Sequence, residues 1–418
     1  MLFFKECKKV ICSMTFALYV ITILAMYVSQ FVPDLKNPVA EPTPGMPYYG
    51  TIEREEPEVL MPAAIQSLIS EYMEGTYIAY PFMFYKEVKL DSAGTEAIAE
   101  IIGEVTDLTK EELDSFTDFV AGGYEAVSDA AGNTSIVYKE TTLPEYELQD
   151  VSYERFKELM VQADEMIGGG SKYSEEFLLS NFSQIAITYE DALAEYEELM
   201  ADDNIAEAYV RLYSDYMGII LAIMPVFVCV GLWQLDKKSQ MEQLIFSRKT
   251  SSAKLIGTRY LALVCCMVVP VLLTFVHALW GINALYPEKE IAFVGAIGLG
   301  LSWLLPGIMI VTAVGAFISE ILAPLFAIFV QGMWWYMVLE MNELTGDISK
   351  WTLILRHNTL GEIWLFEKQF ADFVWNRTYY VLLSFAIIGL TMLIYEKKRK
   401  GVDYGINLWK NHKRKPAA

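Results

Sequence analysis

Six long apolar stretches divide this chain, and a strongly acidic insert separates the first stretch from the second. The insert, residues 33–215, carries 39 Asp and Glu against 10 Lys and Arg, a net charge of −29. The remaining residues carry 14 acids against 22 bases, a net charge of +8 within the total of −21. A helix needs about 20 consecutive apolar residues to cross a bilayer. The pattern therefore predicts a multi-span membrane protein with one large water-exposed domain.

The apolar stretches predict six transmembrane helices, at residues 10–32, 217–235, 260–285, 291–317, 321–339 and 379–395. Between them we expect an amphipathic N-terminus (1–9), an acidic domain (33–216), a connecting loop (236–259), a loop with interfacial or re-entrant helices (340–378) and a basic tail (396–418). The first stretch has the basic start of a signal peptide. Its bulky Met26, Tyr27 and Phe31 disfavour cleavage, so we interpret it as a span.

Lysine and arginine are concentrated on one side of these spans, and this bias sets membrane orientation. The N-terminus, the loop after the second span and the C-terminal tail together hold 17 bases. The short loops on the opposite side hold 5. The distribution predicts a cell-membrane protein with both termini cytoplasmic and the acidic domain extracellular.

The acidic insert is predicted to be mostly helical with some strand, which makes the chain a mainly α membrane protein with an α+β extracellular domain. Residues 33–62 suggest an extended tether, and 75–90 and 133–143 are strand candidates. Thr109 and Glu112 have the spacing of a capping box, and apolar spacing predicts a helix over 153–167. Ser174 is expected to cap the next helix. From Asn204 a helix is expected to run into the second span, with a break near Asp215 as the alternative.

The residues disfavour intrinsic catalysis and a metal or cofactor site in this chain. The 5 cysteines all lie outside the insert, and the 3 histidines are scattered, so no Cys/His cluster is expected. No phosphate-binding loop or nucleophile-elbow motif occurs. His277 is interpreted as a satisfied interior residue rather than a proton relay. The acidic runs after Glu195 are typical of a solvated helix face, with attraction of cationic peptides as the alternative.

The loop between the second and third spans has a short apolar face, Met241, Leu244 and Ile245, flanked by charge. Ser251 or Ser252 is expected to cap the helix that enters the third span. An amphipathic helix of this kind docks onto another protein or lies on the lipid surface. With the start Phe3-Phe4-Lys5-Glu6, the insert after the first span and the ending Glu396-Lys397-Lys398-Arg399, the chain resembles the membrane subunits of type-2 ABC exporters.

The resemblance implies that the loop is a coupling helix that docks on a separate ATPase subunit, which would hold the ATP and Mg. It implies a second permease copy, identical or homologous, as a further partner, within the lipid bilayer and without nucleic acid. It also places the N-terminal helix, with Phe4, Lys5 and Glu6, at the ATPase interface. The loop residues carried over to that interface are Met241, Glu242, Leu244, Ile245, Arg248 and Lys249.

The spans contain few charges, which disfavours a path for small ions. Aromatic and apolar side chains instead suggest an amphiphilic, lipid-like or peptide substrate, although helix packing explains the same residues. Those expected to line the path are Trp280, Trp303, Trp334 and Trp335, with Tyr260 and Met309. The leading hypothesis is an exporter permease that is not itself an enzyme. The alternatives are an antimicrobial-peptide sensor or immunity module coupled to an ATPase, and a structural scaffold.

Overall fold

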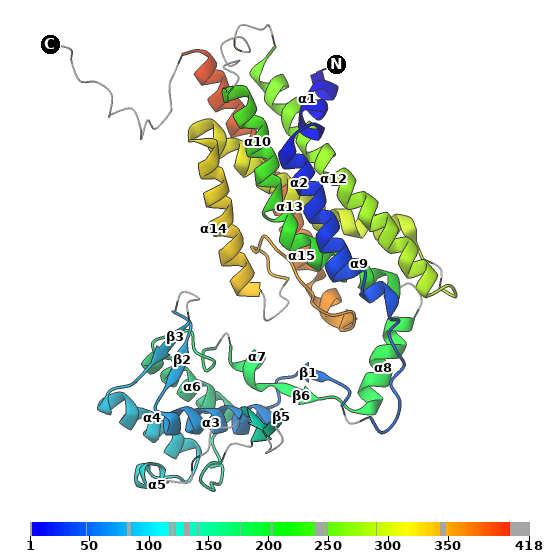
Figure 1. Cartoon of the computed structure of the whole chain (residues 1–418). Coiled ribbons are helices and arrows are strands. Elements are labelled where there is room, and N and C mark those ends of the chain that lie inside the picture. The colour runs from blue at the N-terminus through cyan, green and yellow to red at the C-terminus, as the bar shows by residue number, and fades with distance from the viewer. Residues whose placement is uncertain are drawn as a thin grey trace, which may run out of the picture. The chain divides into compact units, whose positions relative to one another are not determined.

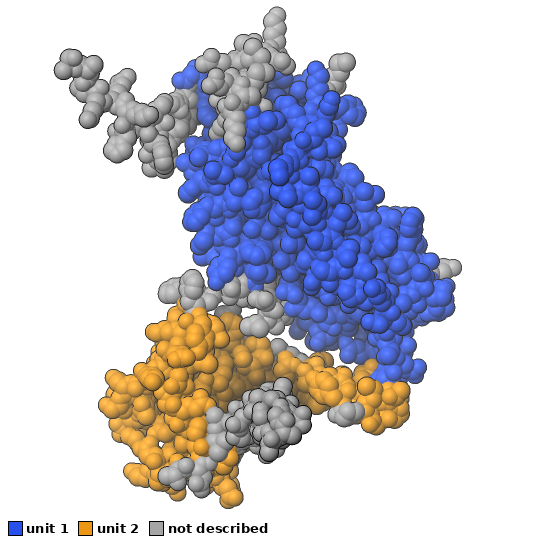
Figure 2. Space-filling model, viewed as in Figure 1, with its two compact units in different colours: residues 1–42, 193–418 blue, residues 43–192 orange. Residues whose placement is uncertain are grey.

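The computed structural model describes residues 2–46, 48–81, 85–116, 119, 123–128, 134–139, 142–175, 177–201, 204–238, 246, 250–289, 291–342 and 348–401. The chain forms two compact units, which Figure 2 shows in different colours. One unit combines residues 1–42 with 193–418 and is called the helical unit here. The other unit, residues 43–192, lies within the acidic insert and is called the insert unit.

The helical unit is built from apolar helices that run beside one another (Figure 1). Among the described residues, five segments are long and apolar enough to cross a membrane: Met14–Phe31, Ile205–Leu235, Ser252–Leu285, Phe293–Ile321 and Ile363–Arg399. Its elements are α1 (Leu2–Ile11), α2 (Met14–Met26), the π-turn η1 (Tyr27–Phe31), the 3₁₀ turn η2 (Asp34–Lys36), α9 (Asn204–Leu221), α10 (Met224–Lys238), α12 (Ser252–Leu285), α13 (Phe293–Ile321), α14 (Pro324–Asn342) and α15 (Ile363–Arg399). The chain is therefore a helical protein suited to a multi-pass membrane location.

Two helices differ in length from the sequence-based expectation. The span expected at 321–339 corresponds to α14, whose apolar part, Pro324–Leu339, is shorter than the five long segments. The last span was expected to begin at residue 379, after a loop with interfacial helices. Instead α15 begins at Ile363 and continues without interruption to Arg399. The aromatic residues before position 379 therefore belong to the first turns of this long helix.

The helix expected to run from Asn204 into the second span is interrupted once, at Ala222 and Ile223 rather than near Asp215. Pro225 has no N–H to donate to the carbonyl four residues earlier, which weakens the helix at this point. Two carbonyl oxygens in this region accept hydrogen bonds from α14. Gln331 Nε2 donates to Ala222 O at 2.7 Å, and Trp335 Nε1 donates to Ile219 O at 2.9 Å. The break is thus stabilised by side chains more than 100 residues away.

Helix α13 lies at the centre of the helical unit and packs against α9, α10, α12, α14 and α15. Small residues allow these close approaches, as is common between membrane helices. At Gly315 an added Cβ would lie 3.2 Å from Val226 of α10, and at Gly300 it would lie 2.6 Å from the ring of Phe275 on α12. Apolar stretches that are separate in sequence therefore share one core.

The insert unit has a helical core and three small antiparallel sheets of two strands each, pairing β1 with β6, β2 with β3 and β4 with β5. The core side chains come mainly from α3, α4 and α6. The elements are β1 (Thr51–Glu53), α3 (Pro57–Glu74), β2 (Tyr77–Ala79), β3 (Lys86–Val88), α4 (Ser92–Val105), α5 (Lys110–Ser115), β4 (Gly123–Ser128), β5 (Thr134–Lys139), α6 (Tyr153–Ile167), α7 (Leu178–Phe182) and β6 (Gln184–Ala186). Helix α8 (Tyr189–Met200) runs from this unit into the helical unit.

Local signals in the insert were mostly correct. The capping box of Thr109 and Glu112 is present at the start of α5, and the helix expected over 153–167 is α6. Helix α6 ends where Gly168 adopts a left-handed conformation, with φ of 112°, which glycine tolerates without a Cβ clash. Ser174 does not cap α7, because its Oγ accepts from Phe177 N in the turn that precedes the helix.

The extended tether predicted over 33–62 ends earlier than expected. Strand β1 pairs with β6, and α3 begins at Pro57 and passes through Pro62. Pro57 is well tolerated because the first N–H groups of a helix have no partner within it, whereas Pro62 lies inside the helix. Buried Leu60, Ala64 and Leu68 then attach α3 to the core of the insert unit. Proline content alone therefore overestimated the length of irregular chain.

Candidate functional site: a buried charge cluster at one end of the helical unit

A buried ion pair fastens the N-terminal helix α1 to α12. Glu6 Oε2 lies 3.3 Å from Arg259 Nε, and the two side chains are 3% and 4% exposed. The second oxygen of Glu6 accepts from Lys9 Nζ at 2.9 Å. The guanidinium of Arg259 also lies over the ring of Trp233 on α10, 5.1 Å from its centroid. One carboxylate and one guanidinium therefore link α1, α10 and α12.

A second carboxylate joins two further helices, α13 and α15, to α10 at the same end. Glu320, near the end of α13, accepts from Trp233 Nε1 at 2.6 Å. Lys398 of α15 donates to the Glu320 main-chain oxygen at 2.8 Å and lies 3.4 Å from its carboxylate. Trp233 thus contacts both charged residues: its ring packs against Arg259, and its Nε1 donates to Glu320. Figure 1 shows α1, the end of α10, the start of α12 and the end of α15 gathered at this end of the unit.

Described residues between α10 and α12 contact the last helix close to this cluster. Arg399 donates to the main-chain oxygens of Phe246 at 3.0 Å and Thr250 at 2.6 Å. The ring of Phe246 packs edge-on against Tyr395, with centroids 5.5 Å apart. Ser251 caps α12 by accepting from Lys254 N, which confirms one of the two expected caps. Ser252 Oγ in turn donates to Glu396. Phe246, Thr250 and Ser252 are therefore attached to the last helix.

The predicted docking residues Met241, Glu242, Leu244, Ile245, Arg248 and Lys249 lie outside the described residues. Of the residues expected at the N-terminal interface, Phe4 is 75% exposed and Lys5 is exposed, whereas Glu6 is buried. Phe4 and Lys5 are thus available to a partner, and Glu6 has a role inside the protein.

Sequence reasoning missed Arg259, Glu320 and Trp233 as a cluster. Arg259 entered only as one basic residue among those that set orientation. One signal was present: Glu320 is an acidic residue at the end of a long apolar stretch, and ionisable residues in such positions are rare and usually paired. Its partners lie 87 and 78 residues away along the chain, so spacing did not reveal them.

The four tryptophans expected along a translocation path occupy different environments. Trp303 is 1% exposed and packs on Phe366 and Phe373, with centroids 5.8 and 4.9 Å away. Trp335 supports the break between α9 and α10, and Trp334 packs on Tyr380. Trp280 is 65% exposed on the outside of α12. Tyr260 and Met309 do come together, because Tyr260 donates to the Met309 main-chain oxygen at 3.1 Å.

A second buried polar cluster ties the segment before α15 to the helical unit. Asp215 of α9 accepts from His357 N at 3.0 Å and from Asn358 N at 2.8 Å. Arg211, one turn earlier, donates to Leu360 O and lies over the ring of Phe366. The Arg377 guanidinium, on α15, donates to Trp303 O at 3.0 Å. The bonds of Asp215 and Arg211 satisfy backbone groups of a segment that has no regular secondary structure, and Arg377 connects α15 to α13.

His357 is neutral in this environment. Burial lowers the pKa of His357 to about 4, and the nearby Arg211 charge acts in the same direction. Its Nε2 lies 2.9 Å from the main-chain oxygen of Gly361, so Nε2 carries the proton and donates. The interpretation of His277 as an interior residue was wrong, because the ring is exposed, although its Nδ1 does have a partner in Tyr27 Oη at 2.6 Å.

In the part of the chain that the structure describes, no group of three or more His, Cys, Asp or Glu side chains is placed to hold a metal ion. The charge cluster connects α1, α10, α12, α13 and α15 through buried contacts. No family model, curated protein or solved structure matches this chain.

Proposed function

We propose that this chain is the permease subunit of an ATP-driven exporter, with ATP and Mg bound by a separate subunit that docks on the loop between α10 and α12. The substrate would be amphiphilic, lipid-like or a peptide. The protein would lie in the cell membrane with both termini cytoplasmic and the insert unit outside. A second permease, identical or homologous, would complete the transporter.

The buried charge cluster is the observation that supports this proposal most directly. A subunit that pushes on the loop would move α10 and α12, which flank it, and α15 through the Arg399 bonds to Phe246 and Thr250. The Glu6–Arg259 pair would carry α1 with them. The fully buried pair resists separation, because an ion left alone in a low-dielectric interior is strongly unfavourable.

Co-purification tests the proposal. Full-length protein, purified in mild detergent, is expected to retain a nucleotide-binding subunit. Replacing Met241, Glu242, Leu244 and Arg248 together with alanine removes the apolar face and the charges assigned to docking, so recovery of that subunit should be lost. The matched control replaces Gln240, Gln243 and Ser247 in the same loop and should leave recovery unchanged. Intact protein without any ATPase, or equal loss in both variants, would contradict the proposal.

A second candidate function, binding of a cationic peptide in a sensor or immunity module, is favoured by a groove in the insert unit. The groove has a volume of about 640 Å³ and an apolar floor that includes Val161, Leu178 and Leu179. Lys157 is its single basic residue, held 2.9 Å from Glu154, and that hydrogen bond raises the pKa of Lys157. Its acidic residues are Glu55, Glu154, Glu158, Glu165 and Glu175.

This candidate predicts salt-dependent binding of a synthetic amphiphilic Lys/Leu peptide to the full-length protein. Changing Glu154, Glu165 and Glu175 to Gln should weaken binding, because three negative charges leave the groove. Lys157→Ala should strengthen it, because the internal cation no longer competes. Fluorescence anisotropy with labelled peptide measures both effects. If both variants bind the peptide with the affinity of the unmodified protein, this groove is excluded as the binding site.

A further inference from the structure

An apolar groove runs along the outside of the helical unit between α12, α13 and α15. Its volume is about 660 Å³ and its accessible lining is entirely apolar. Leu261 and Val269 on α12 and Phe385 on α15 line it and are 53%, 53% and 58% exposed. In a bilayer these side chains meet lipid, since protein loops with unsatisfied backbone groups are excluded from the hydrocarbon region. An open apolar groove at such a surface accommodates hydrocarbon.

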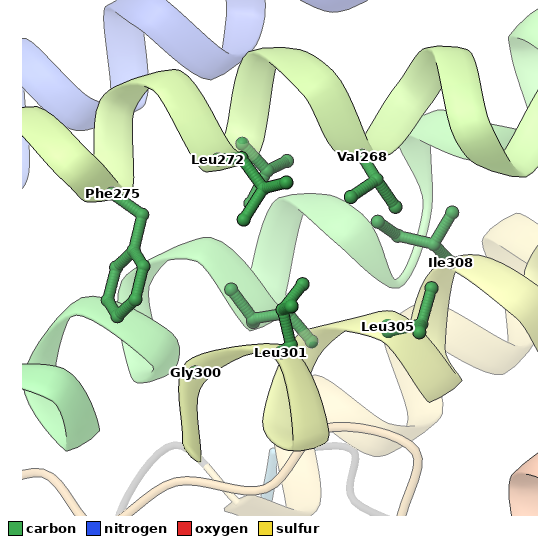
Figure 3. A pocket seen from close by; sticks show the side chains of 9 residues that line it. Val268, Leu272, Phe275, Gly300, Leu301, Leu305 and Ile308 are labelled. Carbon is green, nitrogen blue, oxygen red and sulfur yellow. The ribbon is translucent and has the colours of Figure 1, made fainter. Parts of the chain in front are cut away.

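The groove is long enough for an acyl chain. A smaller apolar cavity continues from it, and the two share Val268, Leu272, Leu301 and Leu305. Figure 3 shows the side chains of α12 and α13 pointing toward one another across this cavity, which ends at Phe275 and Gly300. Along the open groove alone, from Gly257 to Leu272, the helix rises about 23 Å at 1.5 Å per residue. This exceeds the roughly 15 Å that one leaflet contributes to the hydrocarbon core.

Charge is concentrated at the Gly257 end of the groove. Lys254 is exposed and continues the groove-lining face of α12, one turn before Gly257. Lys400 follows the lining residue Met392 by two turns on α15, and its side chain is 70% exposed. The carboxylate of Glu396 also lies at this end, and it is bound by Lys400 at 3.2 Å and by Ser252. Because Lys254 and Lys400 carry two positive charges and Glu396 carries one negative charge, these three residues have a net positive charge beside the groove.

We propose that the groove is a binding site for one anionic glycerophospholipid, with an acyl chain along α12 and the headgroup phosphate at Lys254 and Lys400. Basic residues beside a membrane helix attract anionic headgroups, and two cations at one end select a negative headgroup over a zwitterionic one. The site requires only that the helical unit lies in a bilayer. It stands independently of the permease proposal and of any substrate.

Native mass spectrometry of the full-length protein tests this site. The detergent-purified protein is titrated with phosphatidylglycerol or with phosphatidylcholine of the same acyl chains. We expect phosphatidylglycerol to be retained preferentially, by roughly fivefold for each lysine that contacts the headgroup. The double variant Lys254→Ala and Lys400→Ala should bind both lipids equally. Leu261→Trp, which places an indole in the groove, should reduce retention of both lipids.

Lys350→Ala is the matched control, because Lys350 is a half-exposed lysine paired with Asp372 outside this groove. It should keep the preference for phosphatidylglycerol, and the thermal unfolding midpoint of every variant shows whether the fold is intact. Three results would overturn the site: equal retention of the two lipids by the unmodified protein, an unchanged preference in the Lys254/Lys400 variant, or the same loss of preference in Lys350→Ala.

Discussion

Replacing Arg259 with alanine is expected to destabilise the helical unit by about 3–5 kcal/mol, because it leaves the Glu6 carboxylate buried without its guanidinium. Glu6 and Arg259 are 3% and 4% exposed, so water does not replace the lost partner. The variant also loses the stacking of Arg259 on Trp233. The thermal unfolding midpoint in detergent should fall markedly, and Cys7 on α1 should react faster with a maleimide as α1 separates from α12.

Lys9→Ala provides the matched comparison, since Lys9 binds the same carboxylate from a more exposed position, with 36% of its side chain accessible. Surface ion pairs contribute about 0–1 kcal/mol, so this variant should unfold close to the temperature of the unmodified protein. Exchanging the two charges, Glu6→Arg with Arg259→Glu, should recover part of the loss. Equal midpoints for Arg259→Ala and Lys9→Ala would show that burial of the pair has no energetic consequence.

Replacing Asp215 with alanine is the second large effect that we expect. The substitution leaves the backbone N–H groups of His357 and Asn358 buried without an acceptor. It also removes a carboxylate that interacts with the guanidinium groups of Arg211 and Arg356. Unsatisfied buried donors cost about 1–3 kcal/mol each, so the total loss should be about 3–5 kcal/mol. Limited proteolysis should detect it as faster cleavage within residues 348–362.

Two further variants on the same helix serve as comparisons for Asp215→Ala. Asp215→Asn keeps one side-chain oxygen that accepts a hydrogen bond, so its loss should be intermediate. Glu207→Ala removes an exposed acid two turns earlier, whose charge also acts on Arg211, and its loss should be smaller than that of Asp215→Ala because no buried backbone donor loses its acceptor. Cleavage of the 348–362 segment at the same rate in Asp215→Ala and in the unmodified protein would mean that Asp215 does not hold this segment.

Local signals in the sequence predicted individual elements well. Ser251 at the start of α12, the Thr109–Glu112 capping box and the apolar spacing of α6 each depend on residues within one or two turns. The break at Ala222 and Ile223 was not predicted, because the favoured expectation was a continuous helix and helical periodicity does not register the effect of Pro225. The sequence analysis also assigned the residues before 379 to a separate interfacial segment. Charged residues interrupt the apolar pattern there, but they do not interrupt the helix, which is continuous from Ile363.

Only part of the candidate site could be predicted from the sequence. The basic loop and the amphipathic N-terminus were recognisable from composition, and Phe4 and Lys5 are indeed exposed. The pairing of Glu6 with Arg259 joins residues 253 positions apart, and that of Trp233 with Glu320 joins residues 87 apart. No periodicity covers such separations. The same holds for Gln331 and Ala222, whose contact depends on how α14 packs beside α10.

By itself, the sequence determined the helical class, the long apolar segments, the acidic insert and a few helix caps. Each of these depends on local hydrophobic spacing, backbone hydrogen bonding and charge density, which short windows contain. Only the tertiary structure decided which isolated charges in apolar helices became partners, where the α9–α10 break is stabilised, and where a groove remains open between α12 and α15. Those outcomes depend on side-chain packing between distant segments. Removing one partner of a buried ion pair there changes the free energy of unfolding by several kcal/mol.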